Sequence, residues 1–130
     1  MSNQFNDFLK SYPNASLSVV LKEDIRVVDG DTLRIYEGKE NNEYIRLPCI
    51  NCPEKLSQEG QLATEKTLGF IDSHPLFLII KIGKGYYGRT IGMVFPIQLE
   101  QDLTSYLLEE KAGDFKDYNN SYCQLYESKP

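Results

Sequence analysis

The sequence lacks several features that would place it among membrane or secreted proteins. No apolar run approaches the roughly 20 residues that a membrane-spanning helix needs, and the longest, Pro75–Ile80, has the length of a strand. The first residues carry neither a basic start nor an apolar stretch, so no secretory signal is visible. Three cysteines cannot all pair within one chain, and they do not suggest a disulfide scaffold. We therefore expect a soluble, cytoplasmic protein.

Acidic residues are absent from one stretch of an otherwise acidic chain. The net charge is −5, yet no Asp or Glu occurs between Ser73 and Leu99, a stretch that contains Lys81, Lys84 and Arg89. Residues 98–130 hold seven acids and three bases, a net of −4 that leaves −1 for the rest of the chain. The negative total therefore does not exclude a local basic site for phosphate.

Length and composition favour one packed domain. The chain has 130 residues, of which 41% are hydrophobic and 25% charged, which suits one core and excludes disorder throughout. We expect the domain to span residues 17–113, after an extension at residues 1–16 and before a polar tail at residues 114–130. Apolar residues at helical spacing predict a short helix at Asn3–Tyr12, with a mobile arm as the alternative.

Alternating apolar residues predict strands in the first half of the chain. Leu17–Val27 fits one long strand with a bulge at the charged triplet Lys22–Asp24. Asp29–Asp31 is a tight-turn sequence, after which Thr32–Tyr36 fits a second strand. Glu43–Ile50 fits a third strand, on which alternate side chains point to opposite faces.

The second half of the chain predicts two helices and two further strands. Helices are expected at Gln61–Ile71 and Asp102–Lys111, with Gly113 as the glycine that ends the second. Strands are expected at Pro75–Ile82 and Arg89–Phe95. This order fits an α+β fold, mainly β: the five-stranded Greek-key barrel of the oligonucleotide-binding (OB) fold, with two or three helices. An open sheet with helices on one face is the alternative.

Three motifs occur in order along these predicted elements. They are VVDGDTL at Val27–Leu33, IRLPCINCPE at Ile45–Glu54 and YGR at Tyr87–Arg89. Together they resemble the staphylococcal nuclease (thermonuclease) family, from about residue 17 to about residue 113. The resemblance implies a calcium-dependent nuclease on an OB barrel, with magnesium as an alternative cation. It would hydrolyse single-stranded DNA or RNA with little sequence preference. We expect a monomer that binds nucleic acid and no membrane.

The resemblance implies three cation ligands: Asp31, Asn51 and the backbone carbonyl of Cys52. All three offer oxygen, the donor that calcium and magnesium prefer. The family usually has Asp where this chain has Asn51, so the site loses one charge and we expect weaker cation binding. An Asp-Gly-Asp turn is by itself usually only a hairpin, and this interpretation of Asp31 stays open. Asn51 also favours a second hypothesis, a catalytically silent barrel that binds oligonucleotide or protein.

The resemblance also implies which residues would act on the phosphodiester. Glu54 matches the general base or water-orienting residue, and Arg46 and Arg89 match two arginines whose planar forks bind phosphate. Three further residues would contact the substrate: Lys84, Tyr86 and Tyr87. Each of these residues also has a purely structural interpretation. Arg46 could be an ordinary outward strand arginine, Glu54 an exposed loop charge, and Arg89 a residue that caps a turn. Lys84 could be a solvated lysine at a strand end, and the tyrosines could be half-buried parts of the barrel.

Two cysteines form a C-x-x-C sequence at Cys49 and Cys52. A structural zinc site would need Cys123 and His74 to complete four ligands. A redox pair would normally lie at the start of a helix, whereas this one precedes a loop. We therefore interpret Cys49 as a core residue and Cys52 as part of the site wall.

Overall fold

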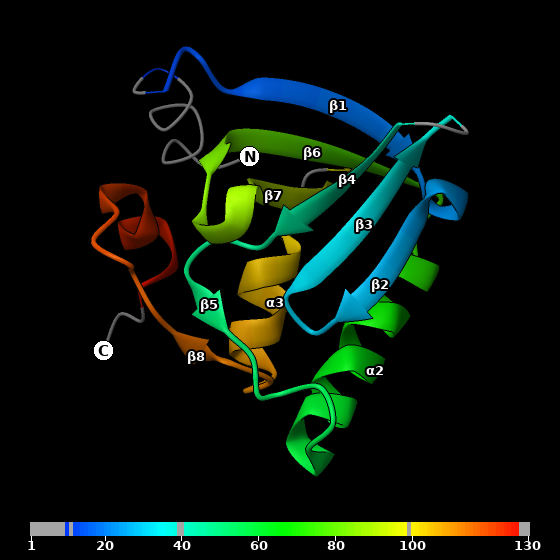
Figure 1. Cartoon of the computed structure of the whole chain (residues 1–130), viewed down its shortest axis with the longest axis vertical. Helices are drawn as coiled ribbons and strands as arrows, with labels where there is room; N and C mark the ends of the chain where they lie inside the picture. The colour runs from blue at the N-terminus through cyan, green and yellow to red at the C-terminus, as the bar shows by residue number, and fades with distance from the viewer. Residues whose placement is uncertain (1–9, 11, 39–40, 99, 128–130) are drawn as a thin grey trace.

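The computed structural model describes residues 10, 12–38, 41–98 and 100–127 of the chain. Its main element is a six-stranded mixed sheet with the strand order β1-β6-β7-β4-β3-β2 (Figure 1). These strands are β1 (Ser16–Leu21), β2 (Ile25–Asp29), β3 (Thr32–Glu37), β4 (Asn41–Arg46), β6 (Leu76–Lys84) and β7 (Thr90–Pro96). Only β4 and β7 pair in parallel; the other ladders of this sheet are antiparallel. Two short strands, β5 (Ile50–Asn51) and β8 (Asp114–Phe115), pair separately.

Two α-helices pack against this sheet, α2 (Gln58–Asp72) against β2 and α3 (Leu103–Glu109) against β7. Ser57 caps α2 and Asp102 caps α3, each accepting a hydrogen bond from the first helical turn. Short 3-10 turns occupy Lys22–Asp24, Tyr86–Gly88 and Ser121–Tyr126. Within the described ranges, no helix is both long and apolar enough to cross a membrane. The helix expected at Asn3–Tyr12 lies almost wholly outside these ranges.

The sheet has one buried and one open face where β3 and β4 pair. Leu33, Ile35 and Ile45 are at most 1% exposed and belong to the core beneath α2 and α3. The alternate residues Arg34 and Tyr44 lie on the opposite, outer face. The alternation predicted from the sequence is thus confirmed for these strands, and so is the mixed α+β fold that consists mainly of strands.

The prediction of one long strand at Leu17–Val27 is wrong, because two strands, β1 and β2, occupy this range. Lys22–Asp24 forms a 3-10 turn rather than a bulge, and the Lys22 N–H donates to the Pro75 carbonyl at 3.0 Å. The turn separates β1 from β2, which occupy the two ends of the strand order. The main sheet therefore has six strands instead of five. Among the described residues no ladder joins β1 to β2, so the pairings do not close a barrel.

Two other local predictions need correction. The third strand ends at Arg46 because the chain turns at Leu47–Cys49, where Cys49 has a positive φ of 67°. Helix α3 ends without a glycine in the left-handed conformation: Lys111 takes that conformation with φ 57°, two residues before Gly113. Because the Lys111 N–H bonds to the Leu108 carbonyl at 3.1 Å, the backbone is held there despite the side chain.

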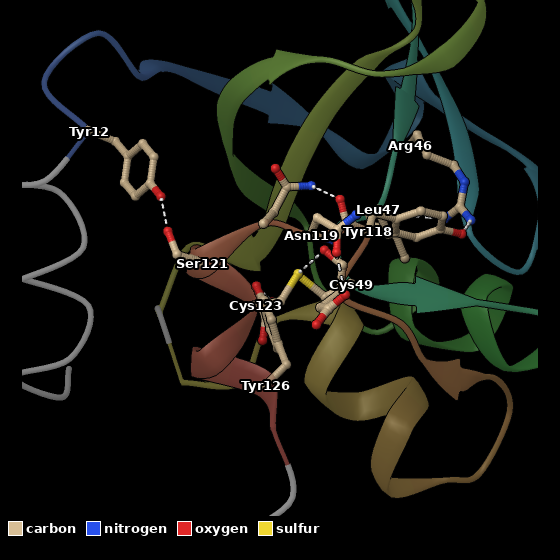
Figure 2. The surroundings of a disulfide bond; sticks show 12 residues. Tyr12, Arg46, Leu47, Cys49, Tyr118, Asn119, Ser121, Cys123 and Tyr126 are labelled. Carbon is tan, nitrogen blue, oxygen red and sulfur yellow. Dashed lines mark hydrogen bonds between the residues drawn. A yellow bond between two sulfur atoms is a disulfide. The ribbon is translucent and has the colours of Figure 1, made fainter.

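The cysteine prediction is also wrong in one respect. Cys49 is buried as expected, but it forms a disulfide with Cys123, 74 residues further along (Figure 2). Spacing could not reveal this pair because Cys123 stands alone in the polar C-terminal segment. The Tyr126 hydroxyl also donates to the Asp102 carboxylate at 2.6 Å. Both contacts hold this segment, which includes β8, against the rest of the chain.

Candidate functional site

The turn Asp29–Asp31 positions the first predicted site residue. The Asp31 N–H donates to Asp29 Oδ1 at 3.1 Å, the local hydrogen bond that makes Asp common in turns. The Thr67 hydroxyl on α2 donates to the Gly30 carbonyl at 2.7 Å. A β-carbon at Gly30 would lie 2.9 Å from both Ala63 Cβ and Cys52 Sγ, so glycine allows α2 and the strand end to approach this closely. The turn is thus fixed from both sides.

The Asp31 carboxylate joins three parts of the chain. Its Oδ2 accepts a hydrogen bond from the Cys52 N–H at 2.8 Å and lies 3.3 Å from Arg46 Nη2. Its Oδ1 accepts from the Thr32 hydroxyl at 3.2 Å. Asp31 is only 7% exposed, so these donors replace the water that an ionised carboxylate needs. Asp31, Arg46 and Cys52, which come from two different motifs, therefore meet at one corner.

Cys52 is a neutral thiol at this corner. Burial, together with the negative charge of Asp31, raises the pKa of the Cys52 thiol to about 12. The same environment acts on Asp29, whose pKa is raised by burial and by its contact with Asp31. Because Cys49 pairs with Cys123, Cys52 is the free cysteine of the described chain and the C-x-x-C sequence forms no disulfide. Cys52 as part of the site wall agrees with its burial.

Arg46 has further partners besides Asp31. Its Nη1 donates to the Leu47 carbonyl at 3.0 Å, and its Nη2 donates to the Tyr118 hydroxyl at 3.3 Å. Figure 2 shows the Tyr118 ring lying beside the Arg46 guanidinium. Tyr118 belongs to the C-terminal segment, where sequence reasoning named no site residue. The available signal was the spacing of four between Tyr118 and Tyr122.

A pocket with a volume of about 460 Å³ opens in front of Arg46. It brings together four of the predicted site residues: Arg46, Asn51, Lys84 and Arg89. Tyr118 and Tyr122 contribute a wall that the sequence did not predict. Three cations from β4, β6 and the segment before β7 thus share one pocket, next to a wall of aromatic rings.

Arg89 and Tyr87 lie at the turn between β6 and β7. Arg89 Nε is buried and has no hydrogen-bond partner among the described residues. The Arg89 guanidinium carbon lies 5.9 Å from the centre of the Tyr87 ring, while Tyr87 itself is 95% exposed. Tyr86 begins the 3-10 turn, and its side chain lies outside the described part of the structure. Arg89 therefore offers an unused donor beside the pocket.

Lys84 belongs to a series of polar contacts that also includes Thr90, Glu43 and Lys81. Its Nζ donates to the Thr90 hydroxyl at 3.0 Å, and that hydroxyl donates to Glu43 Oε2 at 2.6 Å. Lys81 Nζ lies 2.7 Å from Glu43 Oε1. Burial raises the pKa of Glu43, but the hydrogen bonds from Lys81 and Thr90 outweigh it and hold that pKa below its usual value. Glu43 thus contacts the Lys81 side chain directly and the Lys84 side chain through Thr90.

Glu54 is the predicted site residue that these contacts do not include. Its side chain is exposed, and its Oε2 accepts a hydrogen bond from the Leu56 N–H at 3.0 Å. Its carbonyl accepts from the Ser57 hydroxyl at 2.6 Å, and a β-carbon at Gly60 would collide with that carbonyl. The Glu54 backbone is therefore fixed against the start of α2, whereas its carboxylate turns to the loop.

The predicted cation ligands near Asp31 are oxygen atoms, the ligand type that a hard cation prefers. A carboxylate offers about four lone-pair positions, and Cys52, Arg46 and Thr32 use three of those on Asp31. Asn51, the residue before Cys52, is exposed and has an amide oxygen, and Asp114 lies opposite it in the β5–β8 pair. No group of three His, Cys, Asp or Glu side chains that could hold a metal occurs in the described part of the chain. Among the three predicted ligands, Asp31 supplies the one carboxylate and the other two supply neutral oxygens, a combination that binds a divalent cation weakly.

Comparisons with known proteins add no family to this picture. No family model matches the chain, and no curated protein matches it. The site therefore has to be interpreted from its own residues and from the three motifs.

Proposed function

We propose that this chain is a divalent-cation-dependent nuclease that hydrolyses phosphodiester bonds of single-stranded DNA or RNA with little sequence preference. Calcium is the favoured cation, with magnesium as the alternative. The observation that carries the proposal is the pocket in which Arg46, Lys84 and Arg89 converge. Arg46 and Lys84 each have a partner in the fold, whereas Arg89 Nε has none among the described residues, and a phosphate group could bind all three cations.

Each residue has a definite role in this proposal. The Arg46 and Arg89 guanidinium groups bind the phosphate oxygens, and their attraction grows as negative charge develops in the transition state. Lys84 adds a further positive charge, and the Tyr118 and Tyr122 rings offer faces for a base or sugar. Glu54 orients or deprotonates water once its carboxylate rotates away from Leu56. Asp31, Asn51 and the Cys52 carbonyl would hold the cation, which when bound polarises the phosphoryl group.

A catalytically silent module that binds oligonucleotide is the second candidate. Two observations favour it: Asn51 lacks the charge of an acid, and the Glu54 carboxylate is bonded to its own loop. Phosphate binding through Arg46 and Arg89 would persist in such a module, while hydrolysis would not.

Release of acid-soluble nucleotides from denatured DNA and from RNA separates the two candidates. We expect release with calcium, less with magnesium, and none with a chelator. Glu54→Gln should lower turnover by about 100-fold, as loss of a positioned base does, with nucleotide binding retained. No release by the unaltered chain at any calcium concentration, together with tight nucleotide binding, would establish the silent module instead.

Asn51→Asp tests the cation site directly. A second carboxylate adds Coulomb attraction for a divalent ion, so calorimetric titration should show tighter calcium binding and activity at lower calcium. Asn51→Ala is the matched variant and should weaken calcium binding. If all three forms bind calcium equally, the side chain at position 51 is not a ligand.

We also propose that the sheet curves into an OB barrel. Its two outer strands, β1 and β2, are consecutive in the chain and separated only by the three residues Lys22–Asp24. This short link keeps the two ends of the strand order close together. Amide–amide contacts between β1 and β2 in an NMR spectrum would support closure.

The cytoplasmic location expected from the sequence is opposed by the Cys49–Cys123 disulfide, since cytosolic proteins seldom keep such bonds.

A further inference from the structure

Four side chains that do not line the pocket lie together on the outer face of β2, β3 and β4. They are Arg26, Arg34, Tyr36 and Tyr44, called here the outer stripe. Arg26 lies opposite Arg34 across β2 and β3, and Arg34 lies opposite Tyr44 across β3 and β4. These three strands lie side by side in Figure 1. Tyr44 is 41% exposed, so the stripe is accessible.

Aromatic rings hold the two arginines. The Arg34 guanidinium carbon lies 5.1 Å from the ring centres of both Tyr36 and Tyr44, and that of Arg26 lies 5.8 Å from the Tyr36 ring. Arg34 also donates from Nη2 to Asn42 Oδ1 at 3.0 Å. The rings and the amide orient Arg34 and leave its other N–H groups for a ligand.

The charges on the stripe are not balanced by acids. Like charges directly opposite each other on a sheet are destabilising, and the sequence has 19 acids against 14 bases from which partners could be drawn. Yet the ion pairs of the described chain are Arg46–Asp31, Lys66–Glu110 and Lys81–Glu43, and none includes Arg26 or Arg34. Arg26 and Arg34 therefore lie opposite each other, beside aromatic rings and without an ion pair to an acid among the described residues. This surface complements a ligand that has both negative charges and flat rings.

The outer stripe leads to the pocket. In the β3–β4 pair, Arg34 lies opposite Tyr44 and Thr32 lies opposite Arg46. Because residues two apart on a strand share a face, Arg46 is on the same face as the stripe. Each two-residue step along a strand is about 7 Å, so Tyr36, Arg34 and Thr32 cover about 14 Å. Arg46, at the end of this row, lines the pocket. Thr32 is only 4% exposed, so the accessible path runs from Tyr36 and Arg34 past Tyr44 to Arg46, which leaves room for nucleotides beyond the one in the pocket.

We propose that the outer stripe binds the single-stranded nucleic acid that extends from the pocket, with bases stacked on Tyr36 and Tyr44 and phosphates on Arg26 and Arg34. This inference rests on the proposed function, because the same strand enters the pocket. Base stacking on an aromatic side chain tolerates any sequence, which suits a substrate with little sequence preference. The substrate is thus an oligonucleotide rather than a mono- or dinucleotide.

Fluorescence anisotropy with labelled oligothymidylates tests the stripe without cleavage, in a chelator and at low salt. The unaltered chain should bind a 12-mer more tightly than a 2-mer. Tyr44→Ala should raise the Kd for the 12-mer about tenfold and leave the Kd for the 2-mer unchanged. Tyr44→Phe keeps the ring and should bind normally. Arg34→Lys keeps the charge but loses the flat guanidinium, and should bind less tightly than the unaltered chain.

Lys66→Ala on α2 is the matched control because it removes one positive charge far from the stripe in the fold. It should change the Kd for the 12-mer by less than twofold. Equal Kd values for Tyr44→Ala and Tyr44→Phe would overturn the proposal. So would competition by polyglutamate as effective as that by unlabelled 12-mer at equal charge, since this would indicate a site for acidic protein.

Failure of this inference and failure of the proposed function are distinguishable. If nucleotides are released in calcium but Tyr44→Ala binds the 12-mer normally, only the stripe is wrong. If the unaltered chain releases no nucleotides while 12-mer binding depends on Tyr44, the stripe stands and hydrolysis does not.

Discussion

Arg46 and Arg89 line the same pocket, yet the chain holds them in different ways. Arg46 contacts a buried carboxylate, a backbone carbonyl and a tyrosine hydroxyl. Arg89 contacts the ring of the exposed Tyr87 and keeps a buried Nε without a described partner. Arg46 is therefore held by the fold, whereas Arg89 keeps a donor that no described residue uses. Substitutions on the Arg46 side should lower both stability and turnover, and substitutions on the Arg89 side should lower turnover alone.

Cys123→Ala should produce the largest effect, on the side of Arg46. The disulfide closes a loop of 74 residues, and losing such a link costs about 4 kcal/mol in the chain-entropy model. It also releases the segment that holds Tyr118 against Arg46. Thermal unfolding should show a large fall in Tm. Cys52→Ala leaves the disulfide intact and should cost clearly less; equal losses would contradict the anchoring role.

Arg89→Ala should lower turnover by about 100- to 1000-fold, as removal of one group that stabilises transition-state charge does. Nucleotide affinity should fall much less, because the partner charge grows during the reaction. The Tm should be unchanged, since among the described residues Arg89 makes no ion pair. Steady-state kinetics with parallel unfolding measurements test this. An equal loss of affinity and kcat/KM, with kcat unchanged, would make Arg89 a plain binding residue.

Arg46→Ala should instead destabilise the fold, by about 2 kcal/mol. The Asp31 side chain is only 10% exposed, so it would be left as a buried carboxylate with fewer partners. Urea unfolding of Arg46→Ala and of the pair Arg46→Ala with Asp31→Asn checks the cause. The double variant should recover part of the loss because no charge is then buried. Equal stability of Arg46→Ala and Arg89→Ala would remove the contrast between the two sides.

Glu43→Gln should produce the smallest effect, confined to the pH dependence of stability. The pKa of Glu43 is lower in the fold than in the unfolded chain. Its contribution is therefore fully present above the unfolded pKa and is lost as the pH falls through the folded pKa. Because the pair with Lys81 is partly exposed, the difference should stay below about 1 kcal/mol. Unfolding from pH 7 to pH 3 should show a shallower decline for the variant.

The candidate site could be predicted in part because its residues stand in short local motifs. Asp31 follows a tight turn and Arg46 ends a strand, and the structure joins them in an ion pair. The side chain of Glu54 could not be placed in this way, because a carboxylate in a loop can accept a hydrogen bond from a nearby backbone N–H, here that of Leu56. Tyr118 and Tyr122 were missed because their spacing of four, in an acidic and polar segment, does not by itself place them beside a basic pocket.

The sequence by itself determined the alternation of β3 and β4, the presence of α2 and the turn at Asp29–Asp31, although α2 begins at Gln58, three residues before the predicted Gln61. These depend on neighbouring residues, whose spacing decides which side chains share a face. The tertiary structure alone decided three other features. It separated β1 from β2 at Lys22–Asp24, joined Cys49 to Cys123, and set Asp31 against Cys52. Such contacts join segments far apart in the chain, and their partners are selected by the packing of the whole core rather than by local spacing.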